Sequence, residues 1–259
     1  MIEIRLLSAQ GEELCRAQHE KEARLCVLRA YEEGDRFEIC ADSEHLMVQM
    51  DTALAPAEIY ARGGRMTWTV PCGRNRDAYA PGIFELPRHI VIVRQMTDEE
   101  IHQVRCISRN PADLRGDTDF FPHCTANVET RDEACFAARN VIDGYLFNQG
   151  HGEWPWQSWG IGIRQDACCR IDFGREVEAG CVALVLRADF PHDAWWQRVR
   201  LRLSDGSSYT MSLEKTGERQ FMDIGRHVIR WMELDQLEKA DDPSPFPSLS
   251  QWEVYGCDR

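Results

Sequence analysis

The sequence lacks the features that mark several large protein classes. No stretch approaches the roughly 18 consecutive apolar residues that a membrane-spanning helix needs. The first residues, Met1–Arg5, include an acid and no signal-like apolar segment, so we expect a protein that is not exported and is cytoplasmic. The chain has no Gly-rich phosphate loop, no nucleophile elbow and no His-Glu-x-x-His motif. These absences argue against a membrane protein and against the enzyme classes that depend on those motifs.

Basic residues are fewer than acidic ones. The chain has 30 Lys and Arg residues against 43 Asp and Glu, a formal net charge of -13. Nucleic acids and anionic membranes both need a basic face on their protein partner. We therefore expect neither as the main partner, and we interpret the excess of acids as a charged surface that favours solubility.

The cysteines lack a regular spacing. There are eleven, an odd number, with one adjacent pair (Cys168 and Cys169) and no Cys-x-x-Cys. Zinc sites and disulfide frameworks need ligands or partners at regular spacing. We interpret most of these cysteines as reduced, buried, small hydrophobic residues.

Short segments of alternating apolar and polar residues make up most of the first half. Strands are predicted at 1–7, 36–40, 45–50, 57–60, 65–70 and 89–94. The segment 11–31 is rich in Glu, Arg and Lys and has a patchy apolar face, which predicts a surface helix. A short helix is predicted after Thr97, because Thr97 and Glu100 have the spacing of a capping box.

The second half predicts an antiparallel β-sandwich. Strands are predicted at 167–173, 181–188, 197–203, 209–213, 221–224, 228–234 and 252–255, with a short helical turn at 133–141. Ser204–Ser207 predicts a tight hairpin, and three prolines stiffen the loop 242–247. We predict an all-β protein with minor helices, made of two sandwich-like domains at 1–122 and 123–259 with a boundary near Pro122.

Four segments of the second half occur in the order and spacing of one known family. They are Ala137–Gly144 with an Ala-x-x-x-Asp-Gly pattern, Trp159, Cys169–Gly174, and the closing Trp252–Gly256. Through them the region 123–259 resembles the galactose-binding-domain superfamily, the jelly rolls of discoidin domains and carbohydrate-binding modules. The whole chain also resembles a bacterial group labelled carbohydrate-binding proteins. The resemblance implies a jelly roll that binds sugar, although a fold does not by itself establish a function.

The same resemblance implies a structural calcium. In that family the loop after Asp-Gly often holds the ion, and Asp143 and Glu253 stand at the matching places. The loop 145–151 lacks the usual acidic and Thr residues, whereas calcium takes about six to eight oxygen ligands. The alternative interpretation is that Asp143 caps the turn locally.

Two tryptophan clusters, at 153–160 and 187–196, mark the candidate site. They hold five of the eight tryptophans, mixed with Arg, Asp, His and Gln. A sugar needs an aromatic platform for its C–H face and planar side chains for its hydroxyls. We predict non-catalytic carbohydrate binding in a cleft at the loop end of the second sandwich. The predicted cleft residues are His151, Trp154, Trp156, Gln157, Arg187, Asp189, His192, Trp195 and Trp196.

Some of these residues have a structural interpretation as well. Counting by twos along 181–189 puts Arg187 and Asp189 on the face of an apolar row, where they form the floor of a cleft or an internal ion pair. The ion pair is the plainer alternative, because buried charges are usually paired. Trp195 and Trp196 are consecutive, so they point to opposite sides and at most one is a platform. The tryptophans expected in the core are Trp159, Trp231 and Trp252.

Two other functions stay open. Asp189 and His192 could act as an acid–base set in a glycan hydrolase or lyase. A protein-interaction module would use the same tryptophans as hot spots. We assign no catalytic residue, and we expect a sugar or glycan as the partner.

Overall fold

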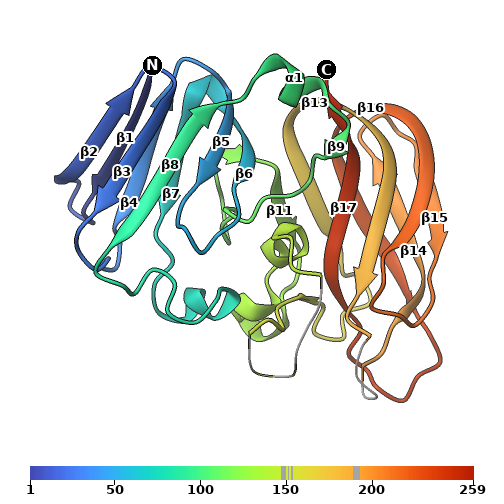
Figure 1. Cartoon of the computed structure of the whole chain (residues 1–259). Coiled ribbons are helices and arrows are strands. Elements are labelled where there is room, and N and C mark those ends of the chain that lie inside the picture. Colours follow the sequence, from blue (N-terminus) through green and yellow to red (C-terminus); the bar gives the residue numbers. More distant parts are fainter. Residues whose placement is uncertain (147–149, 151, 153, 189–192) are drawn as a thin grey trace.

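The computed structural model describes residues 1–146, 150, 152, 154–188 and 193–259. Figure 1 shows two β-structures side by side, the first coloured blue to cyan and the second yellow to red, with the green segments between them. Within the described ranges, none of the helices has the length and hydrophobicity needed to cross a bilayer. The prediction of an all-β protein with minor helices is confirmed.

The first β-structure consists of two antiparallel sheets. One has the order β2 (Glu13–His19), β1 (Ile2–Leu7), β4 (Arg36–Ala41) and β7 (Arg65–Thr69). The other has the order β10 (Phe120–Phe121), β6 (Ala57–Ala61), β5 (His45–Gln49), β8 (His89–Gln95) and β3 (Glu22–Val27). Alternate residues of these strands, such as Ile2, Ile4 and Leu6 of β1, are buried in one hydrophobic cluster between the sheets.

The predicted helix at 11–31 is wrong, because this segment forms the strands β2 and β3. β2 is a largely exposed edge strand in which only Cys15 and Ala17 are half-buried against the core, so the alternation in its sequence is weak. Charged residues on such an edge also discourage pairing with other chains. β3 does carry the strand signal, since Ala23, Leu25 and Val27 are buried in alternation. Pairing of both strands with neighbours outweighs the helical preference of their residues.

The second β-structure is built on two long strands, β13 (Cys169–Leu186) and β16 (Gln220–Lys239), which pair with each other along most of their length. Each was predicted as two strands. The remaining strands are β9 (Arg105–Cys106), β11 (His123–Ala126), β12 (Trp159–Gly160), β14 (Trp196–Leu203), β15 (Ser208–Ser212) and β17 (Ser248–Asp258).

The long strands change partners part-way along, which makes the second structure a sandwich. The first part of β13 pairs with β11 and the last part with β17. The last part of β16 pairs with β14, whose other neighbour is β15. The register of β13 against β16 shifts between Asp172 and Val177, where the partners change. A single hydrophobic cluster with Trp159, Trp196 and Trp252 at 0–1% exposure fills the space between the layers.

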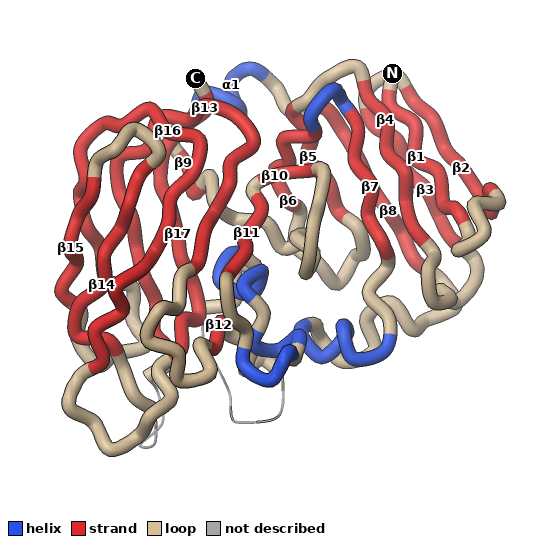
Figure 2. Tube along the Cα trace, turned by 180° about the vertical axis from the view of Figure 1, so that it is seen from behind, coloured by secondary structure: helices blue, strands red, loops and turns tan. Residues whose placement is uncertain are grey.

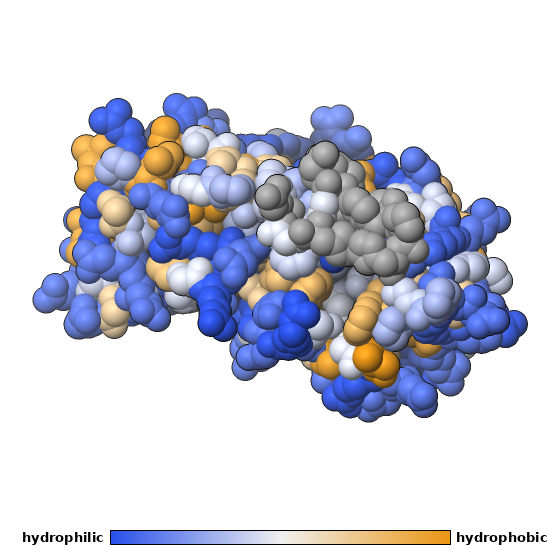
Figure 3. All heavy atoms as spheres, turned by 90° about the horizontal axis from the view of Figure 1, so that it is seen from below, coloured by the Kyte–Doolittle hydropathy of each residue, from blue (hydrophilic) through white to orange (hydrophobic). Residues whose placement is uncertain are grey.

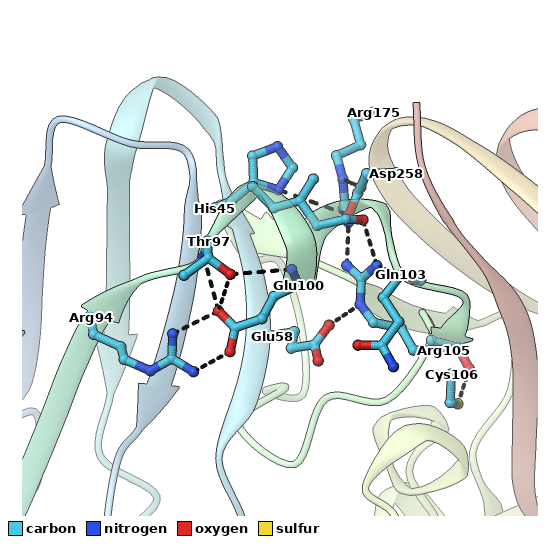
Figure 4. Close-up of polar contacts among 12 residues, drawn as sticks. His45, Glu58, Arg94, Thr97, Glu100, Gln103, Arg105, Cys106, Arg175 and Asp258 are labelled. Carbon is cyan, nitrogen blue, oxygen red and sulfur yellow. Dashed lines mark hydrogen bonds and ion pairs between the residues drawn. The ribbon is translucent and has the colours of Figure 1, made fainter.

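Polar contacts join the two β-structures on the side of the termini, as Figure 4 shows. Asp258 of β17 accepts hydrogen bonds from Arg105, at 2.6 Å, and from Arg175 of β13. Arg105 also pairs with Glu58 of β6, and the Arg175 guanidinium lies 5.0 Å from the centre of the Tyr60 ring. Asp258 is 4% exposed and holds both cations in place, and their contacts with Glu58 and Tyr60 tie the second structure to the first.

The short helix α1 (Asp98–His102) lies beside this network. The Thr97 hydroxyl accepts from the Glu100 backbone N–H, and the Glu100 carboxylate accepts from the Thr97 backbone N–H. This is the predicted capping box. Arg94 at the end of β8 donates two hydrogen bonds to Glu100, at 2.6 and 2.8 Å, so the helix is also held by the first β-structure.

Short 3₁₀ turns gather at the opposite end of the molecule, in blue in Figure 2. They are Gly73–Ala78 in the first structure and Thr130–Asp132, Ala134–Phe136 and Ala138–Ile142 in the second. A further turn, Arg62–Gly64, follows β6 on the side of the termini. The chain passes from β10 in the first structure to β11 in the second at Pro122, while β9 before it already pairs with β17. The boundary near Pro122 therefore stays a prediction.

All eleven cysteines are free thiols, but only Cys124, Cys135 and Cys169 are buried. The interpretation of most cysteines as buried is wrong, because most lie at half-exposed positions of strands and turns.

Candidate functional site

A cavity of about 240 Å³ lies at the loop end of the second sandwich, the face seen in Figure 3. Hydrophilic and apolar side chains mix on this face. Five separate segments contribute to the cavity: the turns at 130–136, the loop before β12, the loop after it, the two ends of the β13–β14 connection, and the loop before β17. The lining residues are Thr130, Arg131, Phe136, Trp156, Ile161, Gly162, Ile163, Arg187, Asp193, Phe246, Pro247 and Ser248.

The cavity brings together two of the predicted residues, Trp156 and Arg187. The Arg187 guanidinium lies 5.5 Å from the centre of the Trp156 ring, within the range of a cation–π contact. The Phe136 ring meets Trp156 edge to face, with the ring centres 5.2 Å apart. Arg187 is buried, and its backbone N–H donates to the Ser248 carbonyl at 3.0 Å. The end of β13 is thereby tied to the start of β17 beneath the cavity.

Asp143 lies behind the loop that carries Trp156. Its carboxylate accepts from Gln251 at 2.6 Å, from the Tyr145 backbone N–H at 2.9 Å and from Gln157 at 3.2 Å. Burial raises the pKa of Asp143 to about 6, although Arg139 and these hydrogen bonds lower it. Desolvation therefore outweighs the bonds that favour the charged form.

The predicted rim residue Gln157 is instead a buried support. It is 5% exposed, and its amide oxygen accepts from the Trp156 backbone N–H at 3.0 Å while its amide nitrogen faces Asp143. Gln251 is oriented in the same way, since its oxygen accepts from the Gly144 backbone N–H at 3.0 Å. Both amides are held, so the backbone next to Trp156 is anchored to β17.

The residues expected to bind calcium do not fit the ion. Three N–H groups point at the Asp143 carboxylate, where a cation would need oxygen ligands. Glu253 accepts from Arg219 at 2.7 and 3.1 Å and from the Tyr255 hydroxyl at 2.8 Å. Across the described part of the chain, no three His, Cys, Asp or Glu side chains come together as a metal site. The alternative interpretation, that Asp143 caps the turn locally, fits the hydrogen bond from the Tyr145 backbone N–H.

The other predicted tryptophans lie away from the cavity. Trp196 is 1% exposed and packs near Trp159, with ring centres 6.1 Å apart, so its prediction as a cleft residue is wrong. Trp195 is half-buried against the core, which matches the expected split of this pair. Trp231 was predicted in the core but is half-exposed, and the Arg170 guanidinium lies 3.9 Å from the centre of its ring. The predicted residues His151, Asp189 and His192 lie outside the described residues.

Sequence reasoning missed two exposed apolar residues of the cavity, Phe246 and Ile163. Phe246 is 58% exposed and Ile163 57% exposed, unusual values for large apolar side chains. The signal for Phe246 was present, because it stands between Pro245 and Pro247 in a loop of fixed backbone. An aromatic residue held by two prolines loses little conformational entropy when it contacts a ligand.

A second, open cleft of about 930 Å³ lies between the two β-structures on the same side. One wall comes from the segment 74–85 of the first structure, and the other from the turn at 133–135 and the tryptophan loop. The predicted residue Trp154 lines this cleft and not the cavity, whereas Trp156 lines both. The Trp154 ring meets Tyr145 edge to face, with ring centres 5.0 Å apart.

No family model and no curated protein matches the chain. Among solved structures, it is similar to chitosan-binding module 1 of a chitosanase/glucanase from Paenibacillus sp. IK-5. That match has 15% identity and a TM-score of 0.43, and covers 59% of this chain and 99% of the module. The lectin domain of lectinolysin with Lewis B antigen gives 15% identity, a TM-score of 0.42, and coverage of 58% and 95%.

A family 32 carbohydrate-binding module of C. perfringens NanJ in complex with galactose gives 13% identity and a TM-score of 0.36. This match covers 51% of this chain and 91% of the module. The expected likeness to carbohydrate-binding sandwiches is thus found among solved structures.

Proposed function

We propose that this protein binds carbohydrate non-catalytically through the cavity at the loop end of its second sandwich. The observation that carries the proposal is the convergence of Trp156, Arg187 and Phe246 on one cavity from three loops. Two aromatic side chains and a guanidinium in one small cavity are the components that a sugar requires. They offer apolar surface for its C–H groups and planar N–H donors for its hydroxyls.

The polarity of the cavity suits a neutral, hydroxyl-bearing ligand. Its lining includes both charged residues, Arg131 and Asp193, and apolar residues such as Ile163 and Phe246. Arg131 is already paired with Glu133, at 2.7 and 2.8 Å, which reduces its attraction for an anion. A purely apolar ligand would leave the polar groups of the lining desolvated without new hydrogen bonds, which costs free energy.

The test is a screen on a broad glycan array, followed by calorimetric titration of the glycans that bind. Phe246→Ala removes an exposed ring from the cavity, and Phe221→Ala is its matched control because Phe221 is 60% exposed and does not line the cavity. We expect Phe246→Ala to weaken binding about fivefold, since loss of one stacking contact costs roughly 1 kcal/mol. Phe221→Ala should bind as the wild type does.

Trp156→Ala should abolish measurable binding, because it removes the aromatic wall and the surface over which Arg187 lies. Thermal unfolding of each variant separates a loss of binding from a loss of fold. Absence of any binding glycan on a broad array, or equal loss of affinity in Phe246→Ala and Phe221→Ala, would contradict the proposal.

A further inference from the structure

The geometry points to a longer ligand: we propose that the open cleft continues the cavity, so that the site takes an oligosaccharide lying across Trp156. This inference rests on the proposed function of the cavity. Trp156 lines both spaces, and the turn beside it does the same, with Phe136 on the cavity and Cys135 on the cleft. A chain of sugar units that extends from the cavity across Trp156 would reach the residues that line the cleft.

The two volumes favour a ligand larger than one sugar. Binding pockets for small molecules usually have about 300 to 1,000 Å³. The cavity, at about 240 Å³, falls below this range and suits a single unit. The cleft, at about 930 Å³, lies near its upper end. A ligand held only in the cavity would make no contact with the larger cleft beside it.

The charges of the cleft favour a neutral oligosaccharide over an anionic one. Arg76 pairs with Glu85 at 2.5 Å, and Glu133 pairs with Arg131 on the cavity side. The whole lining of the two walls holds Arg74 and Arg76 against Asp77, Glu85 and Glu133, so the cleft has no excess of positive charge. Between them the cleft offers apolar surface from Ala80, Pro81 and Ile83, which suits the C–H faces of sugar units.

The wall from the first β-structure is held firmly. The buried Tyr79 ring meets Phe84 edge to face with ring centres 5.4 Å apart, and Phe84 belongs to the core of that structure. From the other side the Arg139 guanidinium lies 4.7 Å from the centre of the Tyr79 ring. Arg139 in turn donates to the Asp113 and Pro111 carbonyls at 2.8 and 3.0 Å. The cleft is thereby preorganised, which lowers the entropic cost of binding.

The inference gives the first β-structure a role in binding. It is tested by calorimetric titration of the full chain with one glycan that binds, as the monosaccharide and as its di- and tetrasaccharide. The wild type should bind the longer sugars about tenfold more tightly, as one or two additional hydrogen bonds would produce.

Ala80→Trp fills the cleft without touching the cavity, so it should bind the monosaccharide normally and lose the tenfold gain for longer sugars. Arg74→Ala removes an exposed N–H donor from the same wall, so it should lose part of the gain for longer sugars. This variant tests the inference if Ala80→Trp does not fold. Leu86→Ala is the control, since Leu86 is 61% exposed and lies next to the wall without lining it.

Equal affinity of the wild type for short and long sugars would overturn the inference and leave the cavity as a monosaccharide site. Full retention of the gain in folded Ala80→Trp, or in Arg74→Ala when that variant decides, would also overturn it. Failure of every sugar to bind the wild type would overturn the proposed function, and this inference with it.

Discussion

Asp143 makes the stability of the protein depend on pH in an unusual direction. Its pKa is about 6 in the folded protein, against 3.8 for the ordinary carboxyl group. Below about pH 4 the group is protonated in both the folded and the unfolded state. Between about pH 4 and pH 6 the folded state keeps the proton that the unfolded state has lost, so stability falls as the pH rises. Above about pH 6 this contribution is gone.

The size of the effect follows from the two pKa values. They differ by about 2 units, and each unit corresponds to about 1.4 kcal/mol, so the free energy of unfolding should fall by about 3 kcal/mol across this window. Asp143→Asn cannot titrate. Its amide group faces the N–H donors of Gln157 and Gln251, which costs about 1–3 kcal/mol at every pH. The difference between wild type and variant therefore has a constant part and a part that depends on pH.

Urea unfolding, followed by tryptophan fluorescence at several pH values from 4 to 7, measures this difference. We expect the wild type to lose about 3 kcal/mol relative to Asp143→Asn as the pH rises from about 4 to about 6. Asp166→Asn is the control, because a hydrogen bond from Arg164 lowers the pKa of the exposed Asp166. The small contribution of Asp166 to stability should therefore increase as the pH rises. A difference that stays flat, or that rises with pH, would refute the desolvation argument for Asp143.

Two further predictions concern the packing that holds the sites in place. A Cβ at Gly256 would lie 2.0 Å from the Glu178 carbonyl oxygen, so Gly256→Ala should cost about 1–3 kcal/mol in urea unfolding. Gly180→Ala, whose Cβ would meet only a carbonyl oxygen at 3.9 Å, should cost much less; equal losses would contradict the contact. Asp258→Asn should cost about 3 kcal/mol at neutral pH, because it leaves two half-buried guanidinium groups without their shared, buried carboxylate. Burial raises the pKa of Asp258, but hydrogen bonds from Arg175 and Arg105 hold it below its ordinary value. The stability that it contributes is therefore lost as the pH falls through that lowered pKa, and the acid-unfolding curves of wild type and variant should converge at low pH. Asp42→Asn, at a carboxylate that is 76% exposed, should have little effect.

Much of the fold could be predicted because its signals are local. The capping box at Thr97 and Glu100 needs only two residues at a fixed spacing, and the helix forms there. The hairpin at Ser204–Ser207 joins β14 to β15 as its turn residues predict. Clean alternation in the sequence of β14 places Val199, Leu201 and Leu203 in the core.

Other features depend on contacts between distant segments, and only the tertiary structure decided them. β2 carries only a weak alternation, because Cys15 and Ala17 are half-buried against the core and the rest of the strand is exposed, and pairing with β1 makes it a strand. Gln157 was predicted at the rim, but hydrogen bonding to Asp143, which also accepts from Gln251 more than a hundred residues away along the chain, turns it inward.

The tryptophan loop shows the same division between sequence and structure. Its composition predicted a binding site at the loop end of the second sandwich. The sequence alone could not sort Trp154 into the cleft and Trp156 onto the wall between cleft and cavity. That placement depends on Phe136, Arg187 and the segment 74–85, which come from three distant parts of the chain. A side chain in a loop takes its direction from what packs against it, and those partners are known only once the chain has folded.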